Sequence, residues 1–174
     1  GYSYPFPVRQ LALQLEGQDL RMAYMDVAPT GPANGRAVIL LHGKNFFGAY
    51  WEGPIRALAA AGFRVIVPDQ LGFGKSSKPD LHYTFELLAG NTKKLLDELG
   101  LARVAVVGHS MGGYLALSIM ARRPERVRSL ILVDTRAVAA PPQVAKVRDE
   151  LADQIEQQGD VEPVVAVMLP GLFS

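Results

Sequence analysis

The stretch RVAVVGHSMGGYLAL, residues 103–117, predicts a strand that turns directly into a helix. A β-branched apolar run ends at Gly108, and Ser110 lies between that glycine and Gly112 in the pattern G-x-S-x-G. In so tight a turn the two glycine positions nearly touch, and a Cβ at either would clash. We therefore expect the Ser110 hydroxyl to stand out of the sheet edge, on a strained backbone held by the strand and the helix.

Outward from this turn, strands and helices alternate along the chain. Apolar runs predict four buried parallel strands with helices between them, at 37–43, 63–69, 103–109 and 127–135. Two more strands are expected within 8–28, around a Gly17-Gln18-Asp19 turn, and residues 136–174 predict two amphipathic helices. The fold class is therefore α/β, a mostly parallel doubly wound sheet with two antiparallel N-terminal strands, in a core of residues 1–135.

Composition limits the kind of protein this is. The chain has 174 residues, no cysteine and a formal net charge of +1, with 49% hydrophobic residues. The lack of cysteine excludes a disulfide framework and a thiolate nucleophile. The near-zero net charge gives no sign of the excess basic charge that is typical of proteins that bind nucleic acid. No window approaches the roughly 18 consecutive apolar residues of a spanning helix. We expect a soluble protein without metal or cofactor, either cytoplasmic or exported after removal of a leader.

Ser110 is predicted to be a nucleophile rather than a plain turn residue. It follows the third of the four predicted parallel strands and opens a helix, which is the context that the motif requires. The first amide of that helix belongs to Met111, and the helix dipole favours negative charge there. Gly113 is expected to let the helix pack closely against the sheet.

The segment LLHGKNFFG, residues 40–48, predicts the second half of the same site. In a doubly wound sheet this loop lies beside the serine turn, and after Gly43 the backbone N–H of Lys44, or that of Asn45, is available. Together with the Met111 N–H it would form an oxyanion hole. A tight structural turn is the plainer interpretation, and both can hold because the hole uses backbone atoms. His42 is expected to be a hydrogen-bonded structural residue.

Three motifs in order, LLHG, VIVPDQLGFGKSSKP and VVGHSMGG, resemble the α/β-hydrolase superfamily over residues 8–135. Residues 135–174 resemble, more loosely, the start of the helical cap of 3-oxoadipate enol-lactonase-like hydrolases, whereas HGKNFFGAYWE resembles another hydrolase subgroup. The resemblance implies a serine hydrolase that cleaves a small carboxylic ester or lactone through an acyl-enzyme on Ser110. Carbon–carbon bond hydrolases and cofactor-free perhydrolases share these motifs, while the serine argues against dehalogenases and epoxide hydrolases, which use an aspartate.

None of the three histidines is a convincing base for Ser110. His42 belongs to the oxyanion loop, and His82 lies in a loop that we expect to be exposed. His109 precedes the serine in an extended strand, so its side chain should point to the opposite side and serve packing or a polar contact. The exposed ammonium of Lys44 stays protonated near neutral pH and is a poor base.

Asp134 is the only well-placed candidate for a triad acid, because it closes the strand after the nucleophile helix. It could equally cap the hinge into the helical region, whereas Asp69 is expected to brace its own glycine-rich loop. The superfamily order is serine, acid, histidine in a fold of eight strands, and this sequence shows six. We therefore expect an N-terminal portion that ends at the start of a cap, with the basic histidine in residues beyond Ser174.

Two other hypotheses for the role of this chain do not require it to be a complete enzyme. The chain could be a non-catalytic remnant that binds an acyl ligand or a partner, which the lack of a base supports. It could also be one part of a split or swapped assembly, in which a second chain completes the fold.

Overall fold

The computed structural model describes residues 2–172, which divide into two compact units. The first runs to Ala137 and the second begins at Val138. Each unit is treated separately below. The first unit holds the predicted serine turn.

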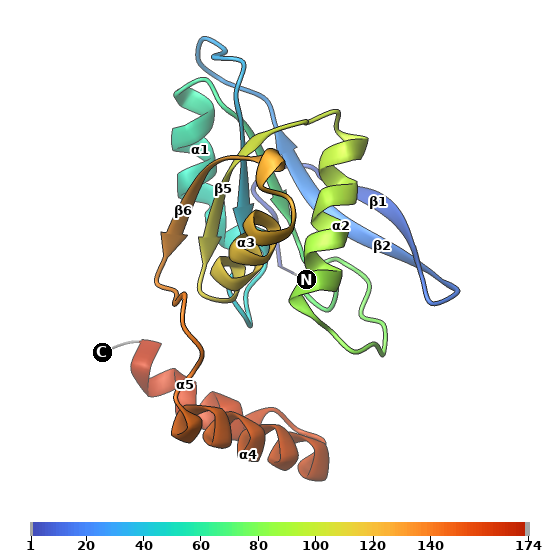
Figure 1. The fold of residues 1–174 in the computed structure, drawn as a ribbon, viewed down its shortest axis with the longest axis vertical. Coiled ribbons are helices and arrows are strands. Elements are labelled where there is room, and N and C mark those ends of the chain that lie inside the picture. Colours follow the sequence, from blue (N-terminus) through green and yellow to red (C-terminus); the bar gives the residue numbers. More distant parts are fainter. Residues whose placement is uncertain (1, 173–174) are drawn as a thin grey trace. The chain divides into compact units, whose positions relative to one another are not determined.

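The first unit is built on a six-stranded sheet in the order β1-β2-β4-β3-β5-β6 (Figure 1). β1 pairs antiparallel with β2, β2 pairs antiparallel with β4, and the other neighbours are parallel. This arrangement confirms the predicted antiparallel pair and the four parallel strands. The strands are β1 (Val8–Leu15), β2 (Gln18–Val27), β3 (Ala37–Leu41), β4 (Arg64–Pro68), β5 (Val104–His109) and β6 (Val127–Val133).

Helices cover both faces of this sheet, as a doubly wound fold requires. Alternate residues of β3 divide between two apolar clusters: Ile39 and Leu41 pack with residues of α2 and α3, while Val38 and Leu40 pack with residues of α1. The short helix η1 precedes α1, and η2 follows α3. Their bounds are η1 (Gly48–Trp51), α1 (Glu52–Ala60), α2 (Phe85–Glu98), α3 (Met111–Arg122) and η2 (Pro124–Arg126).

β6 differs from the expectation of a fully buried strand. It pairs with β5 alone among the described strands, and Ile131, Leu132 and Val133 are exposed. The apolar composition of 127–135 predicted cover on both faces. Within the first unit, the end of this strand is therefore not covered on both faces.

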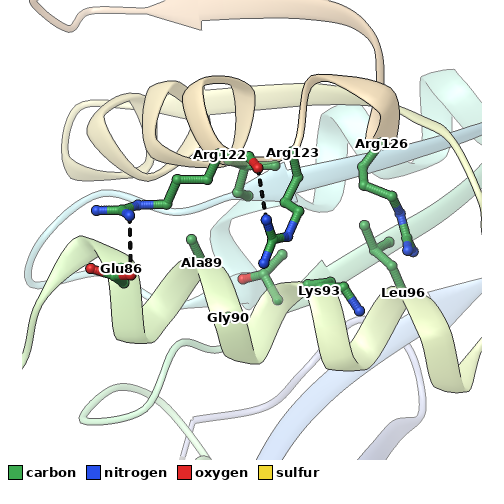
Figure 2. Close-up of a pocket in the computed structure, with 10 residues that line it drawn as sticks. Glu86, Ala89, Gly90, Lys93, Leu96, Arg122, Arg123 and Arg126 are labelled. Atoms are coloured by element: carbon green, nitrogen blue, oxygen red, sulfur yellow. Dashed lines mark hydrogen bonds and ion pairs between the residues drawn. The ribbon is translucent and has the colours of Figure 1, made fainter.

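The helices α2 and α3 pack side by side on one face, as Figure 2 shows. Thr84 caps α2 by accepting a hydrogen bond from the Leu87 amide at 3.0 Å. Across the helix pair, Arg122 forms an ion pair with Glu86 at 3.0 Å. The ion pair joins the two helices, and the N-terminus of α3 lies at the end of β5 because only Ser110 separates these two elements.

The second unit consists of two helices, α4 (Pro142–Gln158) and α5 (Glu162–Leu172). α4 ends at Gly159, whose φ of 67° is left-handed. The Asp160 carboxylate then accepts a hydrogen bond from the Glu162 amide at the start of α5. Among the described residues, none of the helices has the length and apolar character needed to cross a membrane.

Candidate active site

Ser110 lies at the junction of β5 and α3, where the chain reverses direction. Its backbone has φ 51° and ψ −113°, a region that residues with a Cβ rarely enter. The Ser110 amide donates to the Val133 carbonyl at 3.0 Å, and its own carbonyl accepts from the Gly113 amide at 2.9 Å. Hydrogen bonds to β6 and to α3 therefore hold the strained residue, and its side chain is half-buried at the sheet edge.

The glycines around Ser110 are required by close backbone approach. A Cβ on Gly108 would overlap the Gly112 carbonyl, and one on Gly112 would overlap the Leu41 carbonyl at the end of β3. A Cβ on Gly113 would overlap the Thr135 side chain, which follows β6. The predicted contact between the flanking glycines and the close packing of α3 are therefore confirmed.

The loop after β3 forms a tight turn beside the serine at residues 43–46, which we call the oxyanion turn after the role predicted for it from the sequence. The Phe46 amide donates to the Gly43 carbonyl at 3.2 Å, and Asn45 between them has a φ of 68°. Asparagine is one of the few residues that tolerates this conformation in a turn. An ideal Cβ on Gly43 would lie 3.5 Å from the Cβ of Ser110, so the turn and the serine are direct neighbours. Lys44 is the first of the two residues that this hydrogen bond encloses, and it is exposed.

His42 is a buried structural residue, as expected. Its Nδ1–H donates to the Gly43 carbonyl at 2.9 Å, and its Nε2 accepts from the Gln70 amide at 3.0 Å, which fixes the neutral tautomer. Burial lowers the pKa of His42 below 6.5, although the Gly43 carbonyl and the charge of Asp69 partly oppose the shift. The imidazole therefore joins the oxyanion turn to the glycine-rich loop and does not act as a base for Ser110.

This buried imidazole should make the fold sensitive to mild acid. The unfolded chain binds a proton at His42 near pH 6.5, whereas the folded chain does not until a lower pH. The unfolded state thus carries more protons below pH 6.5, and the free energy of unfolding should fall by up to about 1 kcal/mol per pH unit. Urea titrations from pH 8 to pH 5 measure this slope. The variant His42→Gln should be less stable than the wild type at pH 8, and its free energy of unfolding should lose most of this dependence on pH. An equally steep slope in His42→Gln would contradict the assignment.

Asp69 braces the glycine-rich loop, as predicted, and it also anchors the segment after the oxyanion turn. Its buried carboxylate accepts hydrogen bonds from the Lys75 amide at 2.8 Å, the Gly48 amide at 2.7 Å and the Tyr4 hydroxyl at 2.5 Å. Burial, followed by the bond and the charge of Asp69, raises the pKa of Tyr4, so the phenol remains a donor. The carboxylate thereby fixes η1, which begins at Gly48.

The His109 side chain follows the alternation of β5: Val107 packs in the cluster that contains Trp51, and the His109 ring also meets Trp51. An ideal Cβ on Gly43 would lie 3.1 Å from His109 Nδ1 and also close to Ser110, so the imidazole lies against the oxyanion turn. The alternation of a strand does not continue into Ser110, because its positive φ rotates the chain at that residue. The predicted polar contact is present, since the Tyr50 hydroxyl lies 3.0 Å from Nδ1.

Two residues at this site were not identified from the sequence. Tyr50 contacts His109 from η1, and the Thr135 hydroxyl donates to the Ser110 carbonyl at 2.8 Å. The aromatic run FFGAYWE directly after the oxyanion turn was the available signal for Tyr50. Thr135 carried no comparable signal, because its role depends on how β6 is placed next to β5.

The described residues place Asp134 near the serine turn, and none of them lies there as a base for the hydroxyl. Asp134 follows Val133, whose carbonyl holds the Ser110 amide, and its φ of 43° is left-handed. His82 is exposed, as expected. None of the three histidines hydrogen-bonds the Ser110 hydroxyl. No cluster of metal-binding side chains is found in the described part of the chain.

A cavity of about 130 Å³ lies between α2 and α3 (Figure 2), away from Ser110. It occupies the far end of α3, roughly 18 Å along the helix from the serine turn. Of its basic residues, Arg122 pairs with Glu86, and Lys93 and Arg126 both pair with Asp97. These pairings connect neighbouring elements on this face, and we assign the cavity no part in the serine site.

Comparisons with known proteins agree with this geometry. A sequence model described as the alpha/beta hydrolase fold matches residues 36–163. The crystal structure of a "probable hydrolytic enzyme" from Pseudomonas aeruginosa PAO1 is 45% identical, with a TM-score of 0.76, over 91% of this chain and 54% of that one. A thermophilic esterase from Thermogutta terrifontis is 29% identical, with a TM-score of 0.79, over 93% of this chain and 58% of that one.

Among curated proteins, bifunctional epoxide hydrolase 2 of Rattus norvegicus is 32% identical over 148 residues, which is 80% of this chain and 27% of that protein. The chain therefore spans little more than half the length of the two similar structures and about a quarter of this curated relative. The family match includes the oxyanion turn, Ser110 and the helix that follows. This match and the strand–serine–helix geometry together show that the chain belongs to the alpha/beta hydrolase fold family.

Proposed function

We propose that this chain carries the nucleophile of a serine hydrolase acting on small carboxylic esters or lactones. The observation that carries the proposal is the strained Ser110 at the N-terminus of α3, beside the oxyanion turn. Residues held in a strained backbone conformation cluster at functional sites, and the side chain of Ser110 is also half-exposed. The esterase of similar fold supports the ester class.

In the proposed mechanism, the Ser110 hydroxyl attacks the carbonyl carbon of the substrate and forms a tetrahedral intermediate. The amides of Met111 and Lys44 bind the negative oxygen, and the helix dipole of α3 adds to their field. Collapse of the intermediate releases the alcohol, or opens the lactone ring, and leaves an acyl-enzyme. Water then attacks the ester carbon and releases the acid, restoring the serine.

The mechanism needs a general base to take the serine proton and an acid to orient that base. Asp134 is our candidate for the orienting acid, because it lies one residue beyond the carbonyl that holds the Ser110 amide. The base would come from outside residues 2–172. Serine as the nucleophile distinguishes this chain from hydrolases that attack with an aspartate.

The test is covalent labelling of the whole protein with a fluorophosphonate probe, followed by mapping of the modified peptide by mass spectrometry. We expect one adduct, on Ser110, and faster labelling as the pH rises through the titration of the base. Turnover of a panel of small esters and lactones then separates the two substrate classes. Absence of any adduct on the folded protein would exclude an activated serine and favour a binding role for an acyl ligand or partner.

A further inference from the structure

Tyr50 connects the two halves of the serine site. It lies in η1, directly after the oxyanion turn, and its hydroxyl lies 3.0 Å from Nδ1 of His109, the residue before the serine. An ideal Cβ on Gly43, in the oxyanion turn, would lie 3.1 Å from the same Nδ1. The imidazole at the end of β5 thus lies close to both the Tyr50 hydroxyl and the oxyanion turn after β3.

The protonation state of the Tyr50 phenol limits the direction of its hydrogen bond with His109. Burial raises the pKa of Tyr50 to about 12, and the Gly43 amide only partly offsets the shift. The hydroxyl is therefore protonated at neutral pH. It can therefore donate its proton to Nδ1 of His109 in the tautomer that leaves this nitrogen unprotonated.

Packing fixes the Tyr50 ring in this position. The ring lies 4.8 Å from that of the buried Trp51, which in turn meets His109 edge-on at 6.3 Å. Phe46, in the oxyanion turn, contacts Tyr50 at 5.4 Å. The start of η1 is held by the Asp69 carboxylate through the Gly48 amide. The hydroxyl is thus presented by a rigid segment.

We propose that Tyr50 is a positioning residue, whose hydroxyl bridges the segment directly after the oxyanion turn to His109 and so holds that turn at a set distance from the serine turn. The inference rests on the proposed serine hydrolase function. Oxyanion donors act only when they lie within about 3 Å of the developing charge, and a displacement of about 1 Å costs on the order of 100-fold in rate. A bridge between the turns would limit such displacement.

Tyr50→Phe removes the hydroxyl and keeps the ring. We expect the maximal rate of Ser110 acylation, measured with p-nitrophenyl acetate or the fluorophosphonate probe, to fall about 10-fold. The concentration for half-maximal rate should stay within about 2-fold, because ground-state binding does not need the bridge. A lower maximal rate with an unchanged half-maximal concentration distinguishes a positioning role, because a tyrosine that only stabilised the fold would not change the rate alone.

Tyr83→Phe is the matched control, because Tyr83 is similarly exposed and its hydroxyl donates to the Pro79 carbonyl at 2.7 Å. It should leave both constants unchanged. His109→Phe removes the acceptor and keeps a ring, and it should lower the acylation rate in the same way. The double variant should lose less than the product of the two single effects, because both changes break one bridge.

The outcomes separate this inference from the proposed function. If wild-type Ser110 is labelled but Tyr50→Phe reacts at the wild-type rate, the positioning role is wrong and the hydrolase proposal stands. Independent, multiplicative effects of Tyr50→Phe and His109→Phe would also overturn it. If wild-type Ser110 is never labelled, the hydrolase proposal itself fails. Should Tyr50→Phe unfold at a much lower urea concentration, His109→Phe provides the decisive measurement.

Discussion

Ser110→Ala should lower kcat/KM for p-nitrophenyl acetate by about 10⁴-fold or more, because the acyl-enzyme can no longer form. Residual turnover would come from the oxyanion donors and binding alone. The loss should appear without loss of structure, since the hydroxyl makes no hydrogen bond that holds the turn. Steady-state kinetics on the whole protein, with urea unfolding of both forms, measure the two effects together.

The matched control is Ser118→Ala, on the same helix, where the lost hydroxyl makes only a 3.4 Å bond to the Phe85 carbonyl. That variant should keep wild-type kinetics. A companion variant, Ser110→Gly, should be as inactive as Ser110→Ala but more stable than it by about 1–2 kcal/mol, because glycine adopts φ 51° without strain. Full activity in Ser110→Ala would remove the serine from the mechanism.

Gly112→Ala should destabilise the first unit by about 3 kcal/mol or more. The added Cβ would overlap the Leu41 carbonyl and crowd that of His42, and both belong to backbone at the end of a central strand. Neither backbone group can rotate away as a side chain would, so the strain reaches the upper end of the range for overpacked sites. Urea unfolding monitored by circular dichroism gives the free energy of unfolding.

Gly90→Ala is the control for this substitution. Gly90 lies inside α2, and a Cβ there would meet nothing within 4 Å. Alanine should therefore stabilise the helix by about 0.5–1 kcal/mol, through the lower backbone entropy of the unfolded chain. If Gly112→Ala were as well tolerated as Gly90→Ala, close approach between the serine turn and β3 would not be the reason for the glycine.

The turn around Ser110 could be predicted from sequence because its requirements are local. A strand, a tight reversal and a helix within residues 103–117 require glycine at 108 and 112 whatever the surroundings. The parallel direction of the four central strands, with helices on both faces, likewise followed from the alternation of apolar runs and helices. The same reasoning placed Gly43 near Ser110, since neighbouring parallel strands end at one edge of the sheet.

The partners of His109 and the role of Tyr50 could not be predicted in this way. Strand alternation gives the face of β5 on which His109 lies, but not which residues it meets there. Tyr50 reaches His109 across 59 positions in the chain, through a short helix whose start depends on the Asp69 carboxylate. Contacts of this kind arise from how separate loops pack together, and no periodicity in either segment reports them.

The amino-acid sequence by itself thus determined the doubly wound sheet and the serine turn, because both follow from local backbone sterics and from the period of apolar residues. Only the tertiary structure decided which side chains surround that turn: Tyr50, His109 and Thr135 from three separate segments, and the exposed edge of β6. The physical reason is that these contacts join residues far apart in the chain. Their geometry depends on the packing of whole elements, which no single stretch of sequence specifies.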